Sequence, residues 1–152
     1  MRTYLVIMDE TQEAGCALHY AARRAARTGG TVEILAVLEP QEFVQWSGVQ
    51  AAMEEEARLR TEARIAAASG EIKEEAGVRP SITVRHGTPV RAVTDFLKER
   101  EDISALVLAA AADGAPGPLV THFAGAGLAA LPCPLIIVPG QLDAAALNRL
   151  TA

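Results

Sequence analysis

The chain has 152 residues and a formal net charge of −5. No stretch gathers lysine and arginine into a basic stripe, so nucleic acid and anionic membranes are poor candidate partners. Half of the residues are apolar but only 4% are aromatic, which favours helices packed closely on a sheet. A domain of this length buries enough surface to fold without disulfides. Cys16 and Cys133 are therefore interpreted as small buried hydrophobic residues and not as a disulfide or metal ligands.

The first third of the chain predicts strand, helix and strand. Residues 3–8 are a short continuous apolar run, which is typical of a strand buried on both faces, and residues 31–38 form a second such strand. Residues 12–28 between them carry an apolar stripe at helical spacing, and the pair Gly29-Gly30 ends this helix. The stripe consists of Ala14, Ala17, Leu18, Ala21, Ala22 and Ala25.

A long charged helix is expected next. Residues 41–50, which include Phe43, Val44 and Trp46, fit either a loop or a short helical turn. A helix follows over about residues 51–76, and we interpret its many charged side chains as a solvated face. Gly77 ends this helix.

The second half of the chain continues the alternation. A third strand is predicted over residues 81–85, and a helix over residues 90–100 whose Val90, Val93, Phe96 and Leu97 share one face. Then come a strand over residues 105–110, a helix over residues 118–131 and a strand over residues 135–138.

This order predicts one α/β domain, residues 1–140, built as an open parallel five-stranded sheet with helices on both faces. The tail, residues 141–152, is expected to form a short helix in which Leu142, Leu147 and Leu150 share the face that docks on the domain. Ligands of such sheets bind outside the carboxyl ends of the strands. The loops at residues 9–11, 38–40 and 109–117 are therefore the candidate site.

The ordered segments resemble the universal stress protein family over nearly the whole chain. The resemblance is carried by the first strand ending in Asp9, by Ala36-Val37-Leu38, by Gly87-Thr88-Pro89, by Ala105-Leu-Val-Leu108 and by Pro132-Cys-Pro-Leu-Ile-Ile-Val-Pro139. It implies a Rossmann-like fold of the adenine nucleotide alpha hydrolase type. It also implies a homodimer through the last strand, Leu135 to Val138, and a role in the stress response.

Some members of this family bind ATP, whereas others keep the fold without a nucleotide. The resemblance places Asp9 at the adenosine end of the site and the backbone of Val37 against adenine. The remaining candidate ligand residues are Thr11, in the first loop, and Gly114, Gly117 and Thr121, in the loop and helix after the fourth strand. From the residues themselves, Asp9 also fits a cap of the next helix, and Val37 an ordinary core residue.

The phosphate loop departs from the family pattern, in which Gly-x-x-Gly directly follows the fourth strand and Gly-Ser or Gly-Thr comes nine residues later. Here the strand continues into Ala109-Ala-Ala-Ala112. Gly114 and Gly117 have the right mutual spacing, and Gly127 follows after nine residues, but Leu128 occupies the hydroxyl position.

The loop chemistry also opposes a polyphosphate. Pro116 and Pro118 remove two backbone N–H donors, and Asp113 adds a negative charge. No lysine or arginine lies between Arg100 and Arg149, so His122 is the only potential cation of that span. In favour of a ligand, Pro118 suits the first position of a helix and Thr121 offers a hydroxyl one turn later. Gly125 and Gly127 within the expected helix predict a close approach, with packing the commoner explanation.

No catalytic motif is evident. The chain has no Gly-x-Ser-x-Gly, His-Glu-x-x-His or Cys-x-x-Cys sequence, and His19, His86 and His122 fall on different predicted elements. We therefore expect no enzyme, no catalytic residues and no resident metal. The short apolar run at the N-terminus predicts no signal peptide, and no run reaches the length of a membrane span, which together favour a cytoplasmic protein.

Three hypotheses remain open at this stage. The first is a non-enzymatic stress-response module with a degenerate nucleotide site and no certain cofactor. The second is a module that binds ATP or another adenine nucleotide, with Mg²⁺, and hydrolyses it slowly as an incidental property. The third is a flavin- or adenylate-dependent enzyme of a related α/β superfamily.

Overall fold

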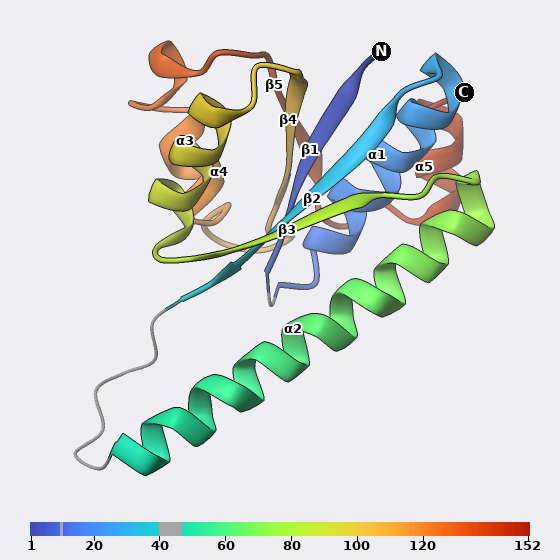
Figure 1. Ribbon diagram of the computed structural model, residues 1–152. Coiled ribbons are helices and arrows are strands. Elements are labelled where there is room, and N and C mark those ends of the chain that lie inside the picture. The colour runs from blue at the N-terminus through green and yellow to red at the C-terminus, as the bar shows by residue number, and fades with distance from the viewer. Residues whose placement is uncertain (10, 40–46) are drawn as a thin grey trace.

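A computed structural model describes residues 1–9, 11–39 and 47–152 (Figure 1). Five parallel strands form one sheet in the order β3-β2-β1-β4-β5. The strands are β1 (Thr3–Met8), β2 (Thr31–Leu38), β3 (Ser81–His86), β4 (Ile103–Ala110) and β5 (Leu135–Pro139). The predicted open parallel α/β fold is therefore confirmed.

Helices cover both faces of this sheet. They are α1 (Ala14–Thr28), α2 (Ser47–Ala76), α3 (Pro89–Glu99), α4 (Pro118–Phe123) and α5 (Ala144–Leu150). Figure 1 shows α3 and α4 on one face, and α1, α5 and the C-terminal half of α2 on the other. The chain reverses its direction of winding at β1, since β2 and β3 lie on one side of it and β4 and β5 on the other. That reversal is where open α/β sheets bind ligands, at the carboxyl ends of the strands.

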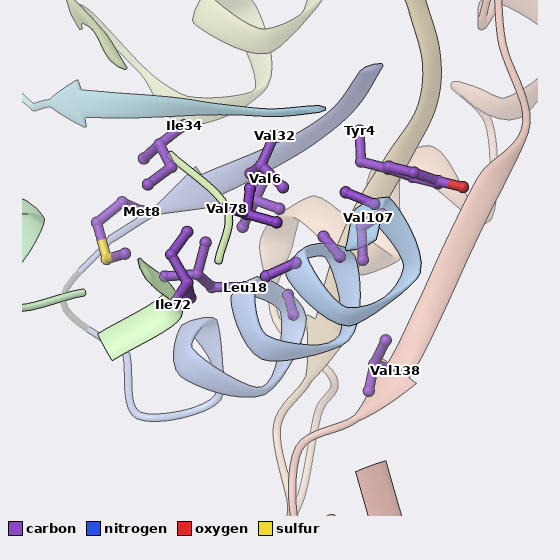
Figure 2. Close-up of a cluster of buried hydrophobic side chains, with 14 of the residues drawn as sticks. Tyr4, Val6, Met8, Leu18, Val32, Ile34, Ile72, Val78, Val107 and Val138 are labelled. Atoms are coloured by element: carbon purple, nitrogen blue, oxygen red, sulfur yellow. The ribbon is translucent and has the colours of Figure 1, made fainter. Parts of the chain in front are cut away.

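The central strand β1 is buried along its whole length. Its side chains alternate between the two faces, so that Val6 joins the core under α1 and Leu5 joins the core under α3 and α4. Figure 2 shows Leu18 of α1 and Ile72 of α2 in the first of these cores, beside Val6. A strand buried on both faces has no polar face, which explains its continuous apolar sequence.

The alanine stripe of α1 packs against the sheet as predicted. All six residues of the stripe are buried. Gly29 ends the helix in the left-handed conformation, at φ 69°, and its N–H donates to the carbonyl of Ala25. Small side chains let the helix axis approach the sheet closely, and this packing positions the loop before α1 at the carboxyl edge of the sheet.

Helix α2 begins at Ser47, earlier than the predicted start near residue 51. Of the segment expected as a loop or short helical turn, residues 41–46, with Phe43, Val44 and Trp46, lie outside the described residues. Ile65 and Ile72 in the C-terminal half are buried in the core, whereas Val49 and Leu59 in the N-terminal half are exposed. Figure 1 shows this N-terminal half extending past the edge of the sheet.

The prediction of a helix over residues 118–131 is wrong in length, because the helix is shorter than expected. Helix α4 ends at Phe123, and turns and a single 3-10 turn (Leu128–Ala130) follow it. The N–H of Gly127 donates to the carbonyl of His122 at 2.8 Å, and the ring of His122 packs against Gly127. A Cβ at Gly127 would lie 2.4 Å from Nε2 of His122. The close approach that the glycines predicted is therefore a packing contact within the chain.

The tail forms α5 and docks on the domain. Leu147 is buried, Leu142 packs partly buried against the same core, and Asp143 caps the helix by accepting from the N–H of Ala146 at 2.8 Å. The expectation that Leu150 shares this buried face is wrong, because its side chain is 52% exposed. Among the described residues, no helix combines the length and apolar character that crossing a membrane requires.

Candidate functional site

Two adjoining hollows lie at the carboxyl edge of the sheet and share Ile7, Asp9 and Pro89. The smaller one, about 100 Å³, lies between the end of β4 and the beginnings of α1 and α4. The other, about 170 Å³, lies between the ends of β1 and β2 and helix α2. We refer to them as the loop hollow and the helix hollow. Pockets for drug-sized ligands usually measure about 300–1,000 Å³, so each hollow alone suits only part of a nucleotide.

The predicted site residues divide between these hollows. Asp9, Thr11 and Gly117 line the loop hollow, and Asp9 and Val37 line the helix hollow. The other two candidates, Gly114 and Thr121, line neither of them and are exposed. The fold thus brings four of the six predicted positions to one edge, around Asp9.

The carboxylate of Asp9 is engaged within its own loop. Its Oδ1 accepts a hydrogen bond from the N–H of Thr11 at 2.9 Å and another from the Thr11 hydroxyl. This arrangement is an Asx turn, which fixes the exit of the chain from β1. Asp9 does not cap α1, because the N-cap residue is Glu13, which forms no side-chain capping bond.

The loop between β4 and α4 is closed by an internal hydrogen bond. The N–H of Ala111 donates to the carbonyl of Pro116 at 3.1 Å, and Pro116 and Pro118 have no N–H of their own. Gly114 and Gly117 adopt positive φ angles of 73° and 111°, which other residues rarely adopt. A phosphate cradle needs several converging N–H groups, and this loop directs one of its few donors into itself.

Two arginines of α2 reach the helix hollow, and the sequence interpretation missed them. Arg60 and Arg64 line it together with Thr61, and Nη1 of Arg64 donates to the backbone carbonyl of Asp9 at 3.2 Å. Both side chains are exposed, as expected for charged residues on a solvated face of α2, and they also border this hollow. The available signal was their spacing, because residues four apart lie on one side of a helix, and this side adjoins the row of Thr61 and the buried Ile65.

The three histidines lie apart from one another. His19 contacts Glu71 and Glu75 of α2 through its two ring nitrogens, at 3.2 and 2.8 Å. His122 packs edge-on against Phe123, and His86 lies at the end of β3 beside a third hollow of about 440 Å³. In residues 1–9, 11–39 and 47–152 there is no group of three potential metal ligands.

Both cysteines are free and half-buried. Cys16 Sγ donates to the carbonyl of Gly140 at 3.2 Å. Burial, together with the nearby charge of Glu13, raises the pKa of the Cys16 thiol, and burial raises that of Cys133. A raised pKa keeps a thiol protonated and unreactive at neutral pH, so neither cysteine has the character of a nucleophile.

Comparison with known proteins agrees with this geometry. The sequence matches the universal stress protein family over residues 1–139. This chain belongs to the universal stress protein family. Membership supports a role as a stress-response module. No protein with a curated description matches the sequence significantly.

Solved structures share the fold of this universal stress protein. It aligns with UspA of Lactobacillus plantarum at a TM-score of 0.74 and 18% identity, over 90% of this chain and 97% of the other. A universal stress protein in complex with cAMP aligns at 0.59 and 20% identity, over 92% and 98% of the two chains. One from Archaeoglobus fulgidus in complex with dAMP aligns at 0.55 and 17% identity, over 91% and 97%.

Proposed function

We propose that this universal stress protein is a non-enzymatic regulatory module whose loop after β4 no longer holds the phosphates of ATP. The hydrogen bond from the Ala111 N–H to the Pro116 carbonyl carries the proposal. It withdraws a donor at the point where the fourth strand ends, next to two prolines and to the negative charge of Asp113. A polyphosphate at this position would meet a carboxylate and few amides.

The absence of an evident catalytic group supports the non-enzymatic part of the proposal. Of the described carboxylates at the two hollows, Asp9 is engaged by Thr11, Glu13 lines the loop hollow and Glu39 the helix hollow, and no described histidine lies near them as a partner base in either lining. A general base must lie within hydrogen-bond reach of the proton that it removes. The module is proposed to act in the cytoplasm through a conformational or binding signal and not through turnover.

The alternative is a genuine adenine-nucleotide binder. Relatives with the same fold have been solved in complex with cAMP and with dAMP, and Asp9 and Val37 of this chain line the helix hollow. Neither of these ligands is a triphosphate, so they favour an adenine site more than they favour a triphosphate cradle.

The deciding experiment measures ATP directly. The purified protein is denatured, any released small molecule is identified by mass spectrometry, and ATP with Mg²⁺ is titrated by calorimetry. The proposal predicts no co-purified ATP and an ATP dissociation constant in the millimolar range or above. Micromolar binding that is lost in the Gly117→Val variant would refute it, because Val at φ 111° distorts the loop.

A further inference from the structure

A cavity of about 460 Å³, which we call the α3–α4 cavity, lies between α3, α4 and the 3-10 turn. Its lining comes from the last turns of α3, from the end of α4 and from the segment 127–132. These segments lead into the first residues of β4 and β5. The cavity therefore lies at the amino edge of the sheet, on the face that α3 and α4 cover (Figure 1). Unlike the loop hollow and the helix hollow, it has the volume that is usual for a small-molecule site, about 300–1,000 Å³.

The floor of this cavity is apolar and belongs to the core. Leu97 of α3 and Phe123 of α4 line it, and both are buried. Leu131 packs partly buried against the same core, and Pro132 adds apolar surface beside it. An apolar ligand group that displaces water from this floor gains the free energy of hydrophobic burial.

One wall of the cavity is formed by His122, whose ring is held in place from two sides. It packs edge-on against Phe123, with the ring centroids 4.9 Å apart. Its Nε2 edge rests against Gly127, where any Cβ would overlap with the ring. The N–H of Gly127 also donates to the carbonyl of His122 at 2.8 Å. This wall is thus formed before a ligand arrives, which lowers the entropic cost of binding.

The rim of the cavity carries one charge of each sign. Lys98 and Glu101 line it and are exposed. In the part of the chain that the structure describes, neither of them takes part in an ion pair. The hydroxyl of Thr94, also in the lining, donates to the carbonyl of Val90 at 2.8 Å, so its oxygen remains as an acceptor. A complementary ligand has a carboxylate for Lys98 and an ammonium group for Glu101 and Thr94.

We propose that the α3–α4 cavity binds a free α-amino acid with a large apolar side chain. The side chain lies on Leu97 and Phe123, the carboxylate pairs with Lys98 and the ammonium group pairs with Glu101. A molecule with only one of these charges leaves the other rim charge without a partner. The inference goes beyond the proposed function and does not depend on it, because the cavity shares no lining residue with the loop hollow or the helix hollow.

The test titrates L-phenylalanine into the ¹⁵N-labelled protein and follows the backbone amide resonances. The amides of Leu97, Gly127 and Ala130 should shift, whereas that of Gly117 at the carboxyl edge should not. 3-Phenylpropionate, 2-phenylethylamine and glycine are titrated in parallel. Phenylalanine should bind at least about twofold more tightly than either single-charge analogue, a modest factor because the rim charges are exposed. Glycine should cause no shift, because it lacks the apolar group.

Matched variants locate the site. Ala130→Trp places a large ring in the lining and should abolish the shifts, whereas Ala129→Trp, at the neighbouring exposed position outside the lining, should leave them. Both positions are exposed, so both variants should keep the circular dichroism spectrum of the wild type. Lys98→Gln should reduce the affinity for phenylalanine to that for 2-phenylethylamine, and Glu101→Gln should reduce it to that for 3-phenylpropionate. Lys73→Gln on α2 removes the same charge as Lys98→Gln and should leave the affinity unchanged.

The absence of shifts at millimolar phenylalanine, or equal shifts in the wild type and Ala130→Trp, would overturn the inference. So would an analogue that binds as tightly as phenylalanine, because the rim would then not recognise both charges. These results leave the proposed function standing, since ATP is measured at the opposite edge of the sheet. Conversely, tight ATP binding that is lost in Gly117→Val refutes the proposed function and leaves the α3–α4 cavity unaffected.

Discussion

Glu33 of β2 lies with its Oε1 3.1 Å from Nη1 of Arg100, at the C-terminal end of α3. The Glu33 side chain is 2% exposed, and the same oxygen accepts from the hydroxyl of Thr83 at 2.8 Å. The Arg100 guanidinium also lies over the ring of Phe96, 5.4 Å from its centroid. A carboxylate within the sheet is thereby neutralised by one residue of the helix that covers it.

Arg100→Gln should lower the free energy of unfolding by about 1–3 kcal/mol, because it leaves the buried Glu33 charge without its cation. The value lies below that for a fully buried pair since Arg100 is 34% exposed and solvent screens it. Urea unfolding followed by circular dichroism measures the change. Arg91→Gln, which breaks an exposed pair with Asp95 on the same helix, serves as the control with a change of about 0.5 kcal/mol or less. Equal changes in both variants would contradict the prediction.

Helix α2 should be anchored by its C-terminal half. Ile72→Ala should cost about 2–5 kcal/mol in unfolding free energy, because Ile72 is fully buried and its truncation leaves a cavity. Leu59→Ala on the same helix should cost about 0.5 kcal/mol or less, since Leu59 is 51% exposed. Thermal and urea unfolding of the two variants measure this contrast. A large effect of Leu59→Ala would show that the overhanging half is packed in solution.

Replacing either of two glycines near the end of α2 by alanine should change the free energy of unfolding, with opposite sign at the two positions. Gly70 lies within the helix with nothing within 4 Å of an added Cβ, so Gly70→Ala should raise the unfolding free energy by about 1 kcal/mol. Gly77 follows the helix at φ 68°, where a Cβ is strained, so Gly77→Ala should lower it by about 1–2 kcal/mol. Changes of the same sign would argue against the helix boundary at Ala76.

The thiols should make stability fall at alkaline pH. The folded-state pKa values of Cys16 and Cys133 are raised above those of exposed thiols, mainly by burial. The folded protein therefore holds these protons more tightly than the unfolded chain does. Their contribution is complete below the unfolded thiol pKa of about 8.5 and is lost as pH rises through the folded values.

The difference in unfolding free energy between the wild type and Cys16→Ala/Cys133→Ala measures this effect from pH 7 to pH 9.5. The wild-type advantage should shrink above about pH 8.5. As a second measure, iodoacetamide should label both thiols more slowly at pH 8 than it labels a free cysteine peptide. A pH-independent difference between the two proteins would contradict the assignment.

A homodimer through β5 remains a prediction. This strand is the last in the sheet order, and Ile137 on it is 39% exposed. Unpaired edge strands are prone to pair with another chain. Sedimentation at micromolar concentration should give twice the mass of the 16.0 kDa chain, and Ile137→Lys should give a monomer with unchanged secondary structure. A monomeric wild type would refute the prediction, whereas Ile82→Lys on the opposite edge strand should leave the dimer intact.

The sequence predicted the elements whose signal is local. The alanine stripe of α1 and the apolar runs of β1 and β2 identify buried faces without reference to any neighbour, and the structure places them as expected. The length of α4 was not predictable in this way. The apolar residues after Phe123 continue a helical pattern, but Gly125 and Gly127 let the chain turn back onto His122.

The sequence predicted which loops form the candidate site, but it did not predict which charged side chains of α2 border it. The loop that begins at Asp9 follows from the rule that ligands bind at the carboxyl ends of parallel strands, whereas Val37 was placed at the site by the resemblance to the universal stress protein family. Neither signal indicated Arg64, because its contact with Asp9 spans 55 residues of sequence. Which row of a charged helix faces the sheet depends on how the long crossover packs, and this is not encoded in the local spacing of charges.

The overhang of α2 has a mechanical consequence for the hollows that it borders. The last deeply buried anchor toward the N-terminus is Ile65, and the helix continues from there to Ser47. At 1.5 Å per residue the stretch between these two residues is about 27 Å long. Arg64 lies at the anchored end of this stretch. Ala51, Glu54 and Arg58 lie along it and form one wall of the 440 Å³ hollow. A rotation of α2 by a few degrees about Ile65 would therefore displace the N-terminal end of the helix by ångströms.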